Sequence, residues 1–161
     1  MALKQRLYRP DAASPWYGEL PVESLYTAGV AGDRFLRDLR DKGRFMATVC
    51  EECEEVYVPG KAFCPVCFSR LEKWVAVGPR GTLDSWTMLF VGLDGKPLKK
   101  PELVGLINLD GATTSIVHRL GGIEAEDLVI GLRVTAELKP KSKRKGSVTD
   151  ILHFKPATRK K

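Results

Sequence analysis

The sequence predicts a mainly β protein in which an N-terminal helix precedes a four-cysteine zinc ribbon of the rubredoxin type and a five-stranded barrel. Three observations support this prediction. All four cysteines lie in two C-x2-C pairs within one short window. One stretch with helical apolar spacing precedes that window, and a series of extended apolar segments separated by turn residues follows it.

The length and composition suit a small folded protein. The chain has 161 residues, of which 43% are hydrophobic, enough for one domain or two small ones. No apolar run approaches the roughly 20 residues that cross a bilayer. The first six residues, Met1 to Arg6, lack the apolar stretch of a signal peptide. We therefore expect a cytoplasmic protein.

The cysteines predict one metal site. Cys50 and Cys53 form the first pair, and Cys64 and Cys67 form the second after ten intervening residues. Each C-x2-C turn directs two sulfurs at one centre, and two such turns complete the tetrahedron that Zn²⁺ prefers. Disulfides and a redox C-x-x-C are the alternatives. Reduced cytoplasmic thiols and the two matched pairs favour zinc. Four thiolates leave no open coordination position, so we expect a structural zinc.

The residues around the cysteines fit a ribbon with one departure. Pro59 and Gly60 supply a turn between the two halves of the site. Many zinc knuckles place glycine directly after the second cysteine of each pair. Here Glu54 and Phe68 occupy those positions, which we expect to loosen the knuckles without removing a ligand.

A helix is expected from Thr27 to Lys42, with Thr27 as its N-cap and Gly43 as its C-cap. Its apolar face consists of Ala28, Ala31, Phe35, Leu36 and Leu39. Residues 44–49, 56–58 and 71–77 are expected to form the strands of the ribbon.

The second half of the chain alternates strands and turns. The expected strands are 81–91, 103–109, 113–120, 132–138 and 148–154, with a short helix at 123–128. Loop 92–97 is extended by Lys99-Lys100-Pro101, and Asp110-Gly111 is a hairpin signal. Five strands with a short helix after the third fit a small Greek-key barrel of the OB type, with a small β-sandwich as the alternative.

These elements suggest four parts. Residues 1–44 would form an aromatic arm and a docking helix, 45–77 the zinc ribbon, 78–157 the barrel and 158–161 a basic tail. The net charge of +6 is concentrated at one end, because residues 139–161 contain nine Lys or Arg and one acid. The partners of such a segment are phosphates of nucleic acid or of a nucleotide cofactor, or the segment is a solubilising loop and tail.

The order of these parts, together with particular motifs, resembles the DUF35 family of zinc-ribbon and OB-fold proteins associated with acyl-CoA enzymes. The resemblance covers about residues 27–156. The matching segments are 35–39 (FLRDL), 43–45 (GRF), 50–53, 58–59, 63–67 (FCPVC), 81–87 (GTLDSWT), 104–109, 126–134 (EDLVIGLRV) and 153–156 (HFKP). The ribbon spacing alone is common, whereas its combination with Gly-Thr-Leu and Asp-Leu-x-x-Gly-x-x-Val is specific.

The resemblance implies an accessory subunit that partners a thiolase-fold catalytic chain in a hetero-oligomer acting on acyl-CoA. The aromatic arm followed by residues 26–32 resembles the thiolase-associated branch, which includes small subunits of benzoylsuccinyl-CoA thiolases. Other members accompany steroid side-chain aldolases. Under this interpretation the arm and helix dock on the partner, and the docking candidates are Tyr8, Trp16, Tyr17, Tyr26 and Phe35. Basic residues would meet the phosphates of CoA; the candidates are Lys96, Lys99, Lys100, Lys141, Lys143, Arg144 and Lys145.

The residues themselves indicate no catalytic set. Once zinc takes the cysteines, no cysteine nucleophile is left. The chain has no G-x-S-x-G, H-E-x-x-H or P-loop motif. His118 and His153 each stand alone in an expected strand, where packing is the commoner role. We therefore expect the catalytic residues to come from another chain.

Two other functions stay open. Ribbons and OB barrels also bind nucleic acid. Against this, the second and third expected barrel strands carry no aromatic residue, and Trp86 and Phe90 share one face that we expect to pack in the core. A purely structural zinc module that contacts no ligand is the third hypothesis.

Overall fold

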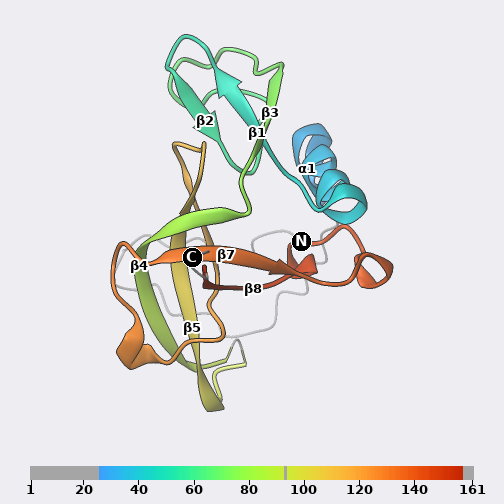
Figure 1. Cartoon of the computed structure of the whole chain (residues 1–161). Coiled ribbons are helices and arrows are strands. Elements are labelled where there is room, and N and C mark those ends of the chain that lie inside the picture. Colours follow the sequence, from blue (N-terminus) through green and yellow to red (C-terminus); the bar gives the residue numbers. More distant parts are fainter. Residues whose placement is uncertain (1–25, 93, 158–161) are drawn as a thin grey trace, which may run out of the picture.

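The computed structural model describes residues 26–92 and 94–157 (Figure 1). It begins with the helix α1, Gly29–Lys42, and then forms two antiparallel sheets. The first sheet consists of β1 (Phe45–Cys50), β2 (Glu55–Tyr57) and β3 (Lys73–Val77). The second consists of β4 (Arg80–Val91), β5 (Pro97–Leu109), β6 (Ser115–Arg119), β7 (Arg133–Leu138) and β8 (Ile151–Pro156). Short 3-10 helices lie at Ala125–Asp127, Lys141–Lys143 and Val148–Asp150.

The first sheet is the zinc ribbon. Its strand order is β2-β1-β3, so the first strand lies in the middle. The two cysteine pairs lie in the turns at one end of this sheet, away from the second sheet (Figure 1).

The second sheet curls into the OB-type barrel that the sequence predicts. Its strand order is β6-β5-β4-β7-β8. The two outer strands approach each other, because Leu120, next to β6, forms a parallel bridge with Phe154 of β8. The N–H of Gly121 donates to the carbonyl of Phe154 at 2.9 Å. The 3-10 helix at Ala125–Asp127 follows the third strand, where a helix was expected.

One continuous core joins the helix, the ribbon and the barrel. The ring of Phe45 lies 6.3 Å from that of Phe35 on α1 and 6.4 Å from that of Phe154 on β8. All three side chains are buried, together with barrel residues such as Leu83 and Ile107. The ribbon therefore sits on the barrel through shared apolar packing and not through a linker alone.

Hydrogen bonds add a second connection between ribbon and barrel. The N–H of Val56 donates to the hydroxyl of Thr113 at 2.8 Å, and the N–H of Thr113 donates back to the carbonyl of Val56 at 3.0 Å. The N–H of Val58 donates to the hydroxyl of Thr114 at 2.9 Å. The turn between β5 and β6 thus continues the edge of the ribbon at β2.

The structure corrects several details of the sequence prediction. The helix begins at Gly29, with Ala28 and not Thr27 at the N-cap. Gly29 has a left-handed φ of 67°, so the regular helix does not continue towards Thr27. Lys99-Lys100-Pro101 belong to β5 and not to the loop. Proline is tolerated there because the pairing of β5 with β6 starts only at Val104.

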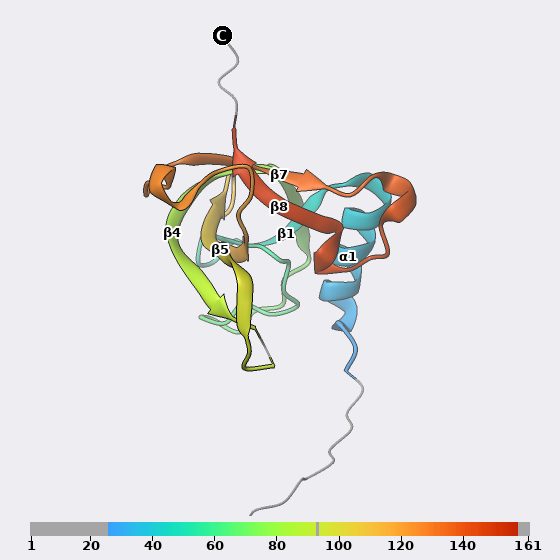
Figure 2. The same ribbon diagram turned by 90° about the horizontal axis from the view of Figure 1, so that it is seen from below.

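Two further corrections concern the barrel strands. Residues Val148–Asp150 form a 3-10 turn, and the last strand starts at Ile151. Trp86 packs partly against the core as expected, but Phe90 is 60% exposed. Phe90 is next to the last residue of β4, and the β4–β5 hairpin projects beyond the barrel at that end (Figures 1 and 2).

Candidate metal centre and functional surfaces

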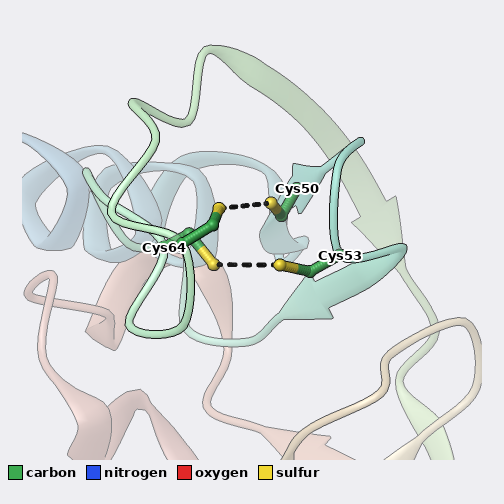
Figure 3. A group of neighbouring side chains, drawn as sticks. Cys50, Cys53 and Cys64 are labelled. Carbon is green, nitrogen blue, oxygen red and sulfur yellow. Dashed lines mark hydrogen bonds between the residues drawn. The ribbon is translucent and has the colours of Figure 1, made fainter.

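The four cysteine sulfurs form a cluster of the size that zinc requires. They all lie within 4.8 Å of one another. The Sγ atoms of Cys50 and Cys67 are 3.5 Å apart, and those of Cys53 and Cys64 are 3.9 Å apart (Figure 3). A tetrahedron with Zn–S bonds of about 2.3 Å has sulfurs about 3.8 Å apart. The donor set and spacing therefore fit one structural Zn²⁺ held by Cys50, Cys53, Cys64 and Cys67.

Neighbouring groups donate hydrogen bonds that suit thiolates. The hydroxyl of Ser69 lies 3.0 Å from the sulfur of Cys67 and 3.6 Å from that of Cys50. The hydroxyl of Tyr57 lies 3.3 Å from the sulfur of Cys64, and the N–H of Val66 donates to the same sulfur at 3.4 Å. Such outer partners orient ligands and tune a metal site.

The acidity of the thiols reflects these contacts. Burial raises the pKa of the Cys64 thiol, but hydrogen bonds from Tyr57 and from backbone N–H groups outweigh burial and lower the pKa to about 6. A hydrogen bond to Cys67, together with burial, raises the pKa of Cys53 to about 12. One thiol of the cluster therefore ionises readily and another resists, so a cation is needed to hold all four as thiolates.

The two knuckles keep their turn conformation without glycine. Glu54 has a φ of 56° and Phe68 a φ of 61°, and each directly follows the second cysteine of its pair. Non-glycine residues seldom adopt this left-handed backbone. Glu54 and Phe68, in place of the usual glycine, therefore add backbone strain to the two turns that carry the four cysteines.

The basic loop between β7 and β8 has a defined shape because of Asp150. This fully buried carboxylate accepts hydrogen bonds from the N–H groups of Lys145 (3.0 Å), Gly146 (2.7 Å) and Ser147 (3.2 Å). Burial alone would raise the pKa of Asp150, but the backbone donors outweigh it and lower the pKa below its usual value. Asp150 thus clamps the loop as an ionised group.

The candidate phosphate contacts fall into two separate groups. Lys96, Lys99 and Lys100 are exposed on the projecting β4–β5 hairpin, whereas Lys141, Lys143 and Lys145 are exposed on the clamped loop beside the end of α1 (Figures 1 and 2). Arg144 differs from the other candidates. Its Nε donates to the carbonyl of Lys139 at 2.7 Å, and its side chain lies against Gly43. The side chain of Arg144 is therefore engaged in contacts within the fold.

The partner-docking candidates also fall into different groups. Tyr8, Trp16 and Tyr17 lie outside the described residues. Tyr26 is 91% exposed, whereas Phe35 is only 4% exposed and packs on Phe45. Phe35 as a docking residue is therefore a wrong prediction, because its ring belongs to the core.

One group of exposed apolar residues that the sequence analysis does not single out lies on the second zinc knuckle. Phe63, Val66 and Phe68 are all more than half exposed, and Phe68 reaches 77%. A groove of about 460 Å³ adjoins Phe63 and is also lined by Val30 and Ala31 of the helix and by Trp74. The signal was present in the sequence, because three large apolar residues in a six-residue loop cannot all turn inward beside two metal ligands.

The histidines have structural surroundings. The ring of His118 packs against Phe154 with centroids 5.8 Å apart, and burial lowers its pKa. The Nε2 of His153 lies 3.2 Å from the carboxylate of Glu137, which also pairs with Lys155 at 2.7 Å. These contacts are those of packed and sheet-edge residues, the commoner role expected from the sequence.

Within residues 26–92 and 94–157, no helix has the length and apolarity needed to cross a bilayer.

Comparison with protein families identifies both halves of this architecture. Residues 37–72 match the rubredoxin-like zinc ribbon domain of ChsH2, and residues 74–139 match the C-terminal OB-fold domain of ChsH2. A DUF35 domain-containing scaffold protein of Methanocaldococcus jannaschii is 22% identical over 126 residues, which cover 76% of this chain and 89% of that protein.

Solved structures show the same fold. A DUF35-family protein of unknown function from Sulfolobus solfataricus matches with a TM-score of 0.61 and 19% identity, over 80% of this chain and 87% of that one. A chain of the Ltp2–ChsH2(DUF35) aldolase matches with a TM-score of 0.56 and 22% identity, over 78% and 94% respectively. The two matched domains together span more than half of the chain in the order ribbon then barrel. This chain therefore belongs to the DUF35 family of zinc-ribbon and OB-fold proteins.

Proposed function

We propose that this chain is a non-catalytic scaffold subunit of a thiolase-type acyltransferase complex that acts on acyl-CoA in the cytoplasm. Within the family, one relative is described as a scaffold protein and one structural neighbour as part of an aldolase complex. The resemblance of the N-terminal region to the thiolase-associated branch favours a thiolase-fold partner, and benzoylsuccinyl-CoA thiolase is the specific candidate. The zinc then serves to fix the ribbon and not to activate a substrate.

The exposed apolar knuckle is the observation that carries this proposal. Phe63, Val66 and Phe68 project from a loop whose backbone is fixed by two metal ligands. Contiguous exposed apolar residues on a soluble protein mark interaction sites. A metal-closed loop presents them at little cost in conformational entropy on binding, because the loop is ordered before the partner arrives.

The clamped basic loop is the better of the two candidate contacts for CoA. Lys141, Lys143 and Lys145 are exposed on a loop that Asp150 holds in shape. The lysines of the β4–β5 hairpin lie instead on a long projection of two strands. Preorganised cations recognise phosphate through charge-assisted hydrogen bonds. Binding energy from this remote handle can support reaction at the thioester on the partner chain.

Partner docking is tested by co-purification. The full chain is tagged in its native host, and the proteins that co-purify are identified by mass spectrometry while zinc is quantified. We expect a stoichiometric thiolase-fold protein and one zinc per chain. A double variant, Val66→Ser with Phe68→Asn, is expected to lose this partner while keeping its zinc, because asparagine tolerates the left-handed backbone.

The matched control for docking is Ile130→Ser, which removes an equally exposed apolar side chain from a different loop. This variant should retain the partner. Co-purification of nucleic acid in place of a protein would instead support the nucleic-acid-binding alternative. Recovery of the zinc-loaded chain alone would contradict the subunit assignment.

CoA contact has its own test, because docking and ligand contact are separate claims. Replacing Lys141, Lys143 and Lys145 by glutamine should raise the KM of the reconstituted complex for its acyl-CoA substrate several-fold with little change in kcat. The control replaces Lys96, Lys99 and Lys100 in the same way. If both triple variants keep the KM, the chain is a structural module that does not touch CoA.

A further inference from the structure

The barrel carries an open strand edge on β4. This strand pairs with β5 along one edge, but it pairs with β7 along the other edge only at Arg80, Gly81 and Thr82. The N–H of Leu83 still donates to the carbonyl of Leu132 at 2.9 Å, ahead of β7. Beyond this point, in the part of the chain that the structure describes, no strand pairs with the outer edge of residues 85–91. Figures 1 and 2 show this part of β4 projecting beyond the barrel with β5.

The two strands of this hairpin differ in how their edges are protected. Among the described residues, the outer edge of β5 also lacks a pairing strand before Leu103, whose carbonyl accepts from the N–H of Leu120 at 2.8 Å, but this edge carries Pro97, Lys99, Lys100 and Pro101. Lysine and proline on an edge are the usual means of preventing further strand pairing. Residues 85–91 of β4, Ser-Trp-Thr-Met-Leu-Phe-Val, contain no charge and no proline.

The open edge is therefore suited to pairing. Leu89, Phe90 and Val91 are all more than two-fifths exposed at its end. Lysines and prolines block strand pairing on β5 of the same hairpin. The lack of such residues on β4 therefore distinguishes this edge. An uncharged, exposed edge with high β propensity is a template for another strand.

The pattern of this segment is complementary to itself. An antiparallel pair related by a two-fold axis through Met88 places Trp86 opposite Phe90, Thr87 opposite Leu89 and Ser85 opposite Val91. Aromatic residues that face each other across antiparallel strands stabilise the pair, and an uncharged strand brings no like charges together. Strand alternation also puts Trp86, Met88 and Phe90 on one face, so the two aromatic pairs flank the methionines.

We propose that a second copy of this chain pairs with this edge, so that β4 strands of two barrels join antiparallel about a two-fold axis at Met88. The interface is isologous, with the same seven residues on each side. It is also small, so the dimer is expected to be weak and to form in the micromolar range of chain concentration. The proposal does not depend on a catalytic partner, and the knuckle that we assign to docking stays free.

The first experiment measures the sedimentation of the zinc-loaded full chain over a range of concentrations. We expect a reversible monomer–dimer equilibrium. Leu89→Lys, which places a charge on the exposed edge, should weaken dimerisation by about tenfold or more. Val117→Lys is the matched control, since Val117 is an exposed apolar residue on β6 and should leave the equilibrium unchanged.

The second experiment tests the register. In the proposed pair the two Met88 Cα atoms lie about 4.5–5.5 Å apart, within the range that a disulfide spans. Met88→Cys should therefore give a covalent dimer under mild oxidation, in which mass spectrometry identifies a disulfide joining two copies of the peptide that carries the substitution. Val91→Cys is exposed on the same strand, but its two copies would lie about 20 Å apart, so it should not crosslink.

Three results would overturn the proposal. A chain that stays monomeric at concentrations far above the micromolar range has no such pairing. A dimer that withstands Leu89→Lys uses another surface. Equal crosslinking of the Met88→Cys and Val91→Cys variants would mean that the contact has no fixed register.

Discussion

The zinc ribbon and the barrel of this chain are stabilised by different means. The ribbon encloses a small cluster in which Tyr57 and Leu71 accompany the cysteines. The barrel buries a wide set of aliphatic and aromatic side chains, including Leu83, Ile107 and Phe154. A few ligands thus decide whether the knuckles fold, whereas many interchangeable apolar residues determine the barrel.

This difference predicts where single changes have the greatest effect. Zinc removal, or Cys64→Ser, should have the largest effect, because structural zinc contributes about 10 kcal/mol or more to folding in isolated finger peptides. We expect loss of stoichiometric zinc and unfolding of the knuckles, while the barrel keeps slowly exchanging amides. Hydrogen exchange followed by mass spectrometry separates the two regions. Unchanged protection in residues 50–67 without metal would contradict this prediction.

The second prediction concerns the residue that links the two regions. Phe45 lies on β1 of the ribbon but packs between Phe35 and Phe154. Phe45→Ala should destabilise the chain by about 3–5 kcal/mol, the usual cost of an aromatic deletion in a core. Phe63→Ala, an exposed phenylalanine in the same ribbon, is the control and should cost less than about 0.5 kcal/mol. Urea denaturation measures both. Similar losses for the two variants would mean that ribbon and barrel do not share a core.

The third prediction concerns the loop of the barrel that a single buried carboxylate holds. Asp150→Asn should cost about 2 kcal/mol at neutral pH, since it weakens charge-assisted hydrogen bonds to three backbone N–H groups. The pKa of Asp150 is lower in the folded chain than in the unfolded one. Its stabilisation is therefore present above the unfolded pKa of about 3.9 and disappears as the pH falls through the lower, folded pKa.

Denaturation of wild type and Asp150→Asn at pH 7 and at pH 3 checks this sign. The gap between the two proteins should narrow at the lower pH. Asp84→Asn is the control, because Asp84 is an exposed carboxylate of the same barrel. A gap that stays constant with pH would show that the loop depends on the shape of residue 150 and not on its charge.

The sequence predicted the two regions unequally. The metal site was accessible from spacing alone, because chemistry restricts four cysteines in two C-x2-C pairs to few arrangements. The barrel strands followed from apolar periodicity and turn residues, with an error at Val148, where the last strand was expected to begin. The start of the helix at Thr27 was misplaced in the same way. The barrel type itself depended on the number of strands and the position of the short helix.

What the sequence did not predict are contacts between residues far apart in the chain. The packing of Phe45 between Phe35 and Phe154 depends on how the ribbon sits on the barrel, which no local pattern encodes. In the sequence, Asp150 stands out only as the single acid of a basic segment. Ser147 and Asp150 nevertheless form a capping box, and the spacing Ser-x-x-Asp is a recognisable signal for one. Strand alternation predicts a core position for Phe90 because it gives the face of a strand but not how far the strand projects beyond the barrel.

The smallest expected effect returns to the ribbon, where metal binding coexists with strained backbone. Phe68 has a left-handed φ of 61°, and its side chain is 77% exposed. Phe68→Gly removes a backbone cost of about 1–2 kcal/mol and adds an unfolded-state entropy cost of about 0.5–1 kcal/mol. The zinc-loaded chain should therefore gain up to about 1 kcal/mol in thermal or urea denaturation. Phe63→Gly is the control in the same knuckle, and it should destabilise because Phe63 pairs with Arg70 in an extended bridge. If Phe68→Gly destabilises as well, the left-handed backbone at Phe68 does not cost stability. The ribbon would then differ from the barrel in its metal ligands, but it would not tolerate more backbone strain than the barrel does.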